Sequence, residues 1–182
     1  MVETCRDLLL SSLSTFYEKN TIFKFLLKEI IDGHHKLSLR LIDWFVTHYS
    51  KANNISYWIN ENNYSIDMPL NYVKDKPPKR ICLYMDYRDQ LKSYTKINFD
   101  SFRRHSRITF VIDIHKPISI DTTIGQLNFF RWIFKNKIID YIIDHYDDIY
   151  NDMIMNNCKL KKKDKLSHTQ GITNSLCTLH FD

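Results

Sequence analysis

The chain has 182 residues, of which 43% are hydrophobic and 14% aromatic, and this composition excludes an intrinsically disordered protein and suits one packed domain. Its net charge of +5 at pH 7 comes mainly from lysine. Because Ala, Gly, Pro and Arg are scarce, as in proteins of AT-rich genomes, lysine content alone says little about function. No apolar stretch approaches the roughly 20 residues that span a bilayer, so no membrane association is expected. The four cysteines are widely spaced, which predicts reduced thiols in a cytosolic setting.

The first fifty residues have the spacing of three amphipathic helices. Apolar side chains recur at helical intervals, and residues 18–20 interrupt the pattern between the first helix and the second. Gly33 stands where a left-handed residue would end the second helix. Ser38 is placed to cap the third helix, with Leu37 and Ile42 as a hydrophobic staple around the cap.

The middle of the chain changes to a strand pattern. Three stretches rich in β-branched and aromatic residues, separated by proline and by Asn and Asp clusters, predict strands. These stretches are 56–59, 81–85 and 107–114. The last alternates almost strictly with period two, as in a strand with one buried face. Within 87–105, Leu91 and Tyr94 indicate a helix.

Two apolar helices and a basic tail complete the chain. Thr123 and Gln126 have the spacing of a capping box, so a helix should begin there, and its many aromatic residues predict that it is buried. A further helix follows Asn136. We interpret 1–156 as one globular domain and 157–182 as a basic, flexible tail. The pattern predicts an α+β fold, with a helical N-terminal segment, a small central mixed or antiparallel sheet with a helix, two C-terminal helices and the tail.

The motifs of several common enzymes are missing from the sequence. Three isolated glycines cannot form a phosphate-binding loop, and there is neither a His-Glu-x-x-His metal helix nor a nucleophile elbow. The tail carries a candidate zinc set of Cys158, His168, Cys177 and His180, but only Cys177 and His180 have a customary ligand spacing. The sequence therefore favours a protein that is not an enzyme, and no catalytic residue, metal or cofactor is assigned.

The strongest functional signal is positive charge in the middle of the chain. Residues 71–116 contain eleven Lys or Arg against five Asp, which is a larger excess than in the whole chain. Cations neutralise phosphates and release counterions, and the interleaved aromatic side chains could stack on unpaired bases. The alternative is a solvated surface whose aromatic residues belong to the core. The predicted nucleic-acid-binding residues are Lys79, Arg80, Arg88, Lys92, Lys96, Arg103, Arg104 and Arg107.

Two smaller groups of charged residues also invite a functional interpretation. The adjacent guanidinium groups of Arg103 and Arg104 suit recognition of phosphate or carboxylate, although ion pairs with the aspartates of 140–148 would be a structural alternative. Asp144 and Asp148 are four residues apart and could hold a divalent cation or share a proton. A solvated helix face explains this pair more simply.

Three stretches of the sequence look familiar together. They are LRLIDWFVTHYSK at 39–51, YTKINFDSFRR at 94–104 and TTIGQLNFFRW at 122–132. They resemble an uncharacterised protein shared by many nucleocytoplasmic large DNA viruses, including mimivirus-like and algal-virus members, over about residues 36–145. The resemblance implies a viral source and a location at cytoplasmic replication sites or in the virion. The family has no assigned catalytic residues, so none is transferred to this chain.

Two functional hypotheses follow. The first is a non-enzymatic, nucleic-acid-associated accessory factor for viral transcription, replication or genome packaging. The second is a virion structural or scaffold protein that acts through protein contacts, suggested by aromatic residues such as Trp44, Trp58 and Trp132. The expected partners are nucleic acid and other viral proteins, with no membrane, in the viral factory of the host cytoplasm or in the virion. The oligomeric state is left open.

Overall fold

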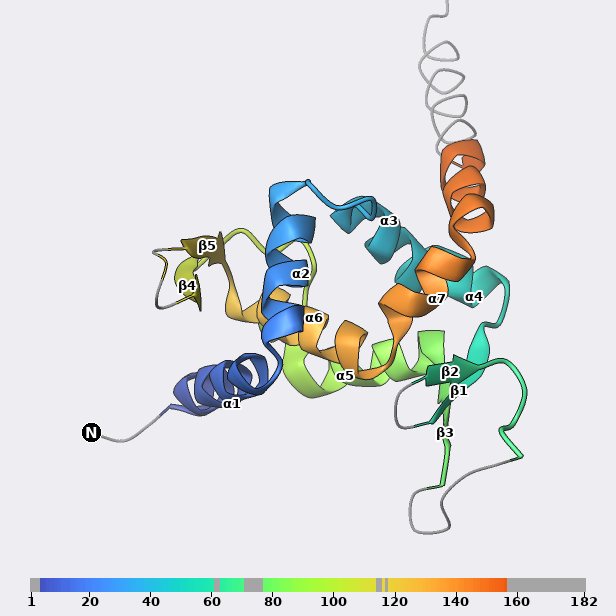
Figure 1. Cartoon of the computed structure of the whole chain (residues 1–182), viewed down its shortest axis with the longest axis horizontal. Helices are drawn as coiled ribbons and strands as arrows, with labels where there is room; N and C mark the ends of the chain where they lie inside the picture. Colours follow the sequence, from blue (N-terminus) through green and yellow to red (C-terminus); the bar gives the residue numbers. More distant parts are fainter. Residues whose placement is uncertain (1–3, 61–62, 71–76, 114–115, 117, 157–182) are drawn as a thin grey trace, which may run out of the picture.

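The computed structural model describes residues 4–60, 63–70, 77–113, 116 and 118–156, and the helices form its main body (Figure 1). The helices are α1 (Cys5–Lys19), α2 (Thr21–Asp32), α3 (Leu39–Trp44), the π-helical turn η1 (Phe45–Tyr49), α4 (Ser50–Ala52), α5 (Leu83–Asn98), α6 (Ile124–Lys135), α7 (Ile138–Asp144) and a further helix over 146–156. The strands are β1 (Ser56–Asn60), β2 (Asn63–Ser65), β3 (Lys79–Cys82), β4 (Ile108–Asp113) and β5 (Ile118–Thr122). The predicted α+β class is confirmed. The predicted tail and its zinc set lie outside the described residues, and no helix among those described is long and apolar enough to cross a membrane.

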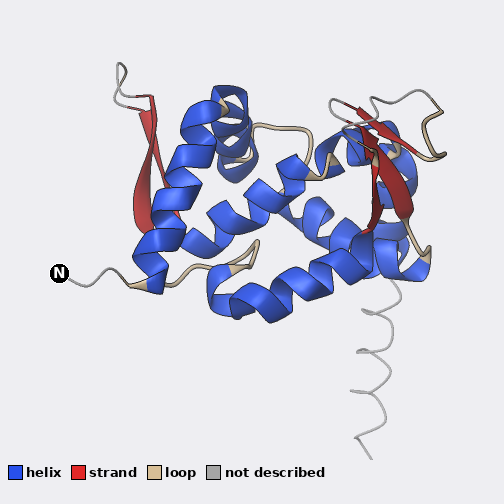
Figure 2. Cartoon of the chain, turned by 90° about the horizontal axis from the view of Figure 1, so that it is seen from below, coloured by secondary structure: helices blue, strands red, loops and turns tan. Residues whose placement is uncertain are grey.

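The strands form two small antiparallel sheets, where the sequence suggested one. The first sheet has the order β2-β1-β3, and the second is the β4-β5 hairpin. Figures 1 and 2 show them at opposite ends of the helical body. Alternate residues of a strand face one side, so the paired residues Tyr57 and Ile81 of the first sheet are both buried, as are Phe110 and Ile120 of the second.

Helix α6 lies at the centre of the core, as its apolar sequence predicted. Ten of its twelve residues are buried, and α1, α5 and α7 all pack against it. Buried hydroxyl groups tie it to distant elements, because Tyr17 donates to the carbonyl of Leu127 (2.9 Å) and Tyr57 to that of Asn136 (2.8 Å), just after the helix. These bonds satisfy tyrosine hydroxyls that burial would otherwise leave unpaired.

The predicted helix ends are largely confirmed. Ser38 accepts a hydrogen bond from the amide of Leu41 (3.2 Å), and Gly33 ends α2 with φ +78°. Thr123 caps α6 by accepting from the amide of Gln126 (3.1 Å), but the Gln126 side chain does not return to the cap. Its amide group bonds instead to a distant loop, so only half of the predicted capping box forms.

The predicted strand at 81–85 is wrong over its second half. Cys82 pairs with Ser56, the first residue of β1, so β3 has no partner beyond that point. The chain turns directly into α5 at Leu83, whose amide donates to the carbonyl of Ile55 (3.0 Å). A short apolar run is compatible with either a strand or the buried end of a helix. Here the strand ends where its pairing with β1 ends, and the rest of the run belongs to α5.

Candidate functional site

The eight predicted nucleic-acid-binding residues are spread over three consecutive segments. Lys79 and Arg80 lie on β3, and Arg88, Lys92 and Lys96 lie on α5, which follows it directly. Arg103, Arg104 and Arg107 lie in the loop between α5 and β4. All are exposed except Arg103, which is half-buried. The structure therefore places the set along one helix and its two ends and does not gather it at one point.

The three cations of α5, which we call the α5 cations, project into solvent. Arg88 and Lys92 are one helical turn apart, and Lys96 follows a kink at Thr95, whose φ is +61°. Within the described residues their one ion pair joins Lys92 Nζ to Asp89 Oδ1 at 3.4 Å. Both side chains of that pair are well exposed, so it holds the lysine only weakly. The charge of the α5 cations is thus largely available to an anionic partner.

The arginine pair after α5 is not held by the C-terminal aspartates. In the part of the chain that the structure describes, no carboxylate lies within 4.0 Å of Arg103 or Arg104. The Cβ atom of Arg103 packs close to Gly125 at the start of α6, whereas Arg104 is exposed. The structural alternative of an ion pair is therefore not observed, and Arg104 is the freer of the two.

Most of the described aromatic residues of the basic region are buried or half-buried. Phe99 is buried with its ring 6.0 Å from that of Tyr87 and 6.3 Å from that of Tyr94. Burial raises the pKa of Tyr87 to about 12. Phe99 is therefore closed to bases, and Tyr87 and Tyr94 are half-buried against the core. Phe102 is exposed and remains accessible.

The tryptophans that suggested a scaffold role are not free on the surface. The indole Nε1 of Trp44 donates to Asp152 (2.8 Å), and Trp132 is buried with its Nε1 donating to Asp86 (2.6 Å). Trp58 is half-buried on β1. The aromatic content of the chain thus serves internal packing at these positions.

The three stretches that carried the family resemblance meet in space. Asp43 Oδ1, from the first stretch, accepts a hydrogen bond from Ser101 Oγ of the second (2.7 Å). The carbonyl of Ser101 accepts in turn from Nε2 of Gln126 in the third (2.8 Å). We call Asp43, Ser101 and Gln126 the polar clamp. It fixes the end of α5 and the following loop against the start of α6.

The polar clamp makes the stability of the protein depend on pH. Burial raises the pKa of the Asp43 carboxyl above its ordinary 3.8, with a further rise from Asp100, while the Ser101 hydrogen bond, His48 and Lys96 act in the opposite direction. The folded state therefore holds this proton more tightly than the unfolded state does. The stabilising contribution is present below the unfolded pKa and is lost as pH rises through the folded pKa.

Replacing Asp43 by asparagine should remove this loss, because the amide oxygen still accepts from Ser101 and never ionises. We expect the free energy of unfolding of Asp43→Asn, relative to that of the wild type, to rise between about pH 3 and about pH 7. Urea unfolding across this range measures it. Asp89→Asn removes one charge from an exposed site and controls for net charge. A constant difference between Asp43→Asn and wild type would contradict the expectation.

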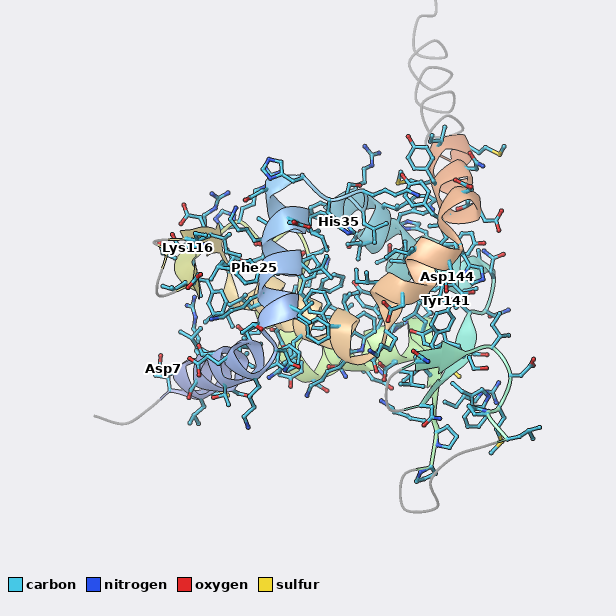
Figure 3. All side chains as sticks on the ribbon, in the orientation of Figure 1. Asp7, Phe25, His35, Lys116, Tyr141 and Asp144 are labelled. Atoms are coloured by element: carbon cyan, nitrogen blue, oxygen red, sulfur yellow. The ribbon has the colours of Figure 1, made fainter. Side chains whose placement is uncertain are left out.

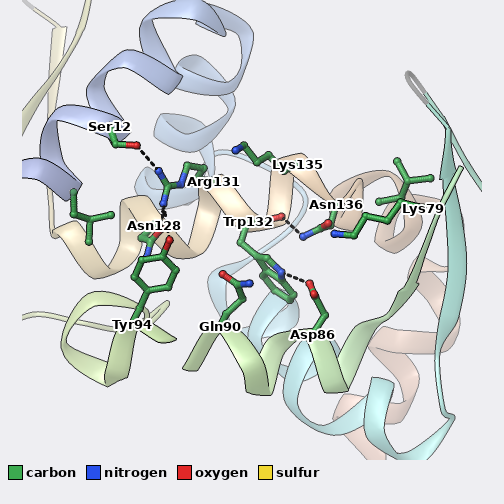
Figure 4. A pocket seen from close by; sticks show the side chains of 12 residues that line it. Ser12, Lys79, Asp86, Gln90, Tyr94, Asn128, Arg131, Trp132, Lys135 and Asn136 are labelled. Carbon is green, nitrogen blue, oxygen red and sulfur yellow. Dashed lines mark hydrogen bonds between the residues drawn. The ribbon is translucent and has the colours of Figure 1, made fainter. Parts of the chain in front are cut away.

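A cleft of about 620 Å³ opens on another side of α5 (Figure 4). Residues of α1, α5, α6, β1 and β3 line it, together with Asn136 just after α6. The lining residues are Leu9, Ser12, Ile59, Lys79, Asp86, Gln90, Tyr94, Asn128, Arg131, Trp132, Lys135 and Asn136. Of these, only Lys79 is among the binding residues that the sequence predicts. A usable signal was Arg131, an isolated arginine in an otherwise buried apolar stretch.

Arg131 is held in the cleft by neutral groups. Its guanidinium donates to Ser12 Oγ (3.0 Å), to Asn128 Oδ1 (2.6 Å) and, at 3.4 Å, to the hydroxyl of Tyr94. Asn128 is itself fixed, because its Nδ2 donates to the carbonyl of Asn98 (2.9 Å). No carboxylate among the described residues lies within 4.0 Å of Arg131. The side chain is therefore oriented while its charge stays uncompensated.

The cleft and the α5 cations occupy different faces of α5. Asp86, Gln90 and Tyr94 repeat every four residues along the cleft side of the helix. Arg88 and Lys92 each follow a cleft residue by two positions, which is about 200° around the helix axis. The two basic features are therefore separate surfaces, and Lys79 of β3 belongs to the cleft.

The described residues contain no group of three His, Cys, Asp or Glu side chains that could hold a metal ion. Asp144, on α7 (Figure 3), instead accepts a hydrogen bond from the hydroxyl of Tyr64. This bond links α7 to β2, so Asp144 has a structural contact.

The chain belongs to a protein family of unknown function, DUF7197, which matches it over residues 3–178. It is similar to Uncharacterized protein L507 of Acanthamoeba polyphaga mimivirus, with 34% identity over 164 residues. That alignment covers 88% of this chain and 58% of the mimivirus protein, so the chain spans less than two thirds of the relative's length. No solved structure matches the chain. The predicted resemblance to an uncharacterised protein of large DNA viruses is confirmed.

Proposed function

We propose that the protein is a non-enzymatic accessory factor of a large DNA virus that binds nucleic acid during transcription, replication or genome packaging. The observation that carries this proposal is the exposure of the α5 cations, which have one weak ion pair among the described residues. Arg104 and Arg107, exposed in the following loop, extend the positive charge. The host cytoplasm, at the viral factory, or the virion would be the corresponding location.

The mode of binding follows from which side chains are accessible. Cations on a helix surface can neutralise phosphates, whereas Phe99 is buried and Tyr87 and Tyr94 are half-buried against the core, away from the α5 cations. We therefore propose contacts with the phosphate backbone, with little sequence preference and strong salt dependence. This role is preferred to a scaffold role because the tryptophans that suggested the latter are engaged or half-buried within the fold.

The test compares two variants of equal charge change by fluorescence anisotropy with a labelled DNA duplex. The first, Arg88→Gln/Lys92→Gln/Lys96→Gln, removes the α5 cations. We expect it to weaken binding and to reduce the slope of log affinity against log salt concentration by up to about 3, or about 0.9 for each lost phosphate contact.

The control variant, Arg6→Gln/Lys19→Gln/Lys116→Gln, removes three exposed cations from α1 and from the turn between β4 and β5. It should leave the salt slope nearly unchanged if the interface lies on α5. Absence of binding by the wild type at about 50 mM salt, or equal losses in both variants, would contradict the proposal.

A further inference from the structure

We propose that the cleft beside α6 binds a ligand of mononucleotide size that carries a phosphate monoester, with Arg131 as the main phosphate contact. The proposal starts from the charge of the lining. Three cationic side chains, Lys79, Arg131 and Lys135, face the cleft with one carboxylate, Asp86. The excess of positive charge in a concave site favours an anionic ligand.

Arg131 is prepared for such a ligand before it arrives. Three neutral oxygens hold its guanidinium, so little side-chain freedom remains to be lost on binding. A half-buried arginine without a carboxylate partner gains charge-assisted hydrogen bonds from an incoming phosphate. Three of the five guanidinium N–H groups serve these oxygens, so a phosphate would take the remaining donors or replace the long 3.4 Å contact to Tyr94.

The one carboxylate of the cleft is already engaged. Asp86 accepts from the indole Nε1 of Trp132, and Figure 4 shows it on the far side of that ring from Arg131. Lys79 lies at the end of the cleft opposite Arg131, so positive charge is present at both ends. The anionic group of the ligand therefore meets Arg131 without a competing acid beside it.

The size and polarity of the cleft define the rest of the ligand. A volume of about 620 Å³ is far larger than a bare phosphate needs and lies within the range of small-molecule sites. Between Arg131 and Lys79, the amide of Gln90 has no hydrogen-bond partner among the described residues. It can donate to or accept from a sugar or base. These features fit a nucleoside attached to the phosphate.

A nucleoside monophosphate could be a free nucleotide or the phosphorylated end of a nucleic-acid strand, and the two share the chemistry that Arg131 would recognise. The inference does not depend on the proposed function, because the cleft and the α5 cations lie on different faces of α5. Loss of one site can therefore be measured while the other is intact.

The experiment titrates the full chain with AMP, adenosine, inorganic phosphate and short oligonucleotides bearing a 5′-phosphate or a 5′-hydroxyl. Calorimetry gives the affinity for each ligand. We expect AMP, or the 5′-phosphorylated strand, to bind at least about tenfold more tightly than its unphosphorylated counterpart. Binding of AMP indicates a free nucleotide, and a phosphate effect confined to the strand indicates a strand end.

Variants then assign the contact. Arg131→Gln should lower the affinity for the phosphorylated ligand at least about tenfold. The affinity of Arg131→Lys should lie between those of the wild type and Arg131→Gln, because lysine keeps the charge but lacks the planar guanidinium. Duplex affinity through the α5 cations should be unchanged. If Arg131→Gln does not fold, Lys135→Gln, at an exposed position, tests the same cleft. The inference would be overturned if neither AMP nor the 5′-phosphorylated strand bound more tightly than its unphosphorylated counterpart. It would also be overturned if the phosphorylated ligand that binds did so no better than inorganic phosphate, or bound the folded variants as tightly as the wild type.

Discussion

Replacing Phe99 by alanine is expected to lower the free energy of unfolding by about 3–5 kcal/mol, the usual cost of removing a buried aromatic ring. Phe99 is 1% exposed, and its ring also lies 5.4 Å from that of Phe129 and 5.6 Å from that of Trp132. It thus joins the end of α5 to α6. The cavity left by alanine would be lined by side chains that other contacts hold in place, so it could collapse only in part.

The matched control is Phe102→Ala, three residues later in the same segment. Phe102 is 43% exposed, and its replacement should change the free energy of unfolding by less than about 0.5 kcal/mol. Urea unfolding followed by circular dichroism measures both variants. If the two variants lost similar free energies of unfolding, or if Phe99→Ala lost less than about 1 kcal/mol, the Phe99 ring would not be part of the packed core.

Substitution of Gly125 by valine should destabilise the protein by about 2–3 kcal/mol. A Cβ atom at Gly125 would lie 3.0 Å from the carbonyl oxygen of Ile97, 3.5 Å from the amide nitrogen of Asp100 and 3.6 Å from Arg103 Cβ. The first two are backbone atoms, and the amide of Asp100 also donates to the carbonyl of Gly125 (3.3 Å), so the loop cannot move away without losing this contact. Valine adds two methyl groups in this space.

Alanine at the same position separates crowding from helix propensity. Gly125→Ala brings the Cβ close to Ile97, but alanine gains up to about 1 kcal/mol of helix propensity over glycine. The free energy of unfolding should therefore change by less than about 1 kcal/mol. Thermal or urea unfolding of both variants gives the comparison. If valine were tolerated as well as alanine, the close approach of the loop to α6 would be wrong.

Local signals in the sequence predicted most helices and their ends. The caps at Ser38 and Thr123 and the left-handed Gly33 depend on side chains within a few residues, so their patterns are visible without tertiary structure. The burial of α6 was equally clear from its composition. The full capping box of Thr4 and Asp7 on α1 has the same local character and was overlooked.

The features that the sequence did not predict depend on contacts between distant segments. β5 was missed because its pairing with β4 defines it, and the end of β3 was misplaced because the length of β1 decides it. The same holds for the cleft, where Arg131 gains its role from Ser12 and Tyr94 of two other helices. The cationic residues could be listed from the sequence. Which of them face solvent and which side chains of α5 face the cleft depends on the orientation of α5 about its own axis, and packing against other elements sets that orientation.

The central place of α6 also governs when the protein can fold during its synthesis. Tyr17 finds its acceptor on Leu127, 110 positions later, and Tyr57 finds its own on Asn136, 79 positions later. The apolar faces of α1 and α2 therefore emerge from the ribosome long before the helix that covers them. A nascent chain that ends before residue 124 lacks the helix at the centre of the core, so it exposes these faces to chaperones or to aggregation. Folding should thus be a late, cooperative event that begins once α6 has left the exit tunnel.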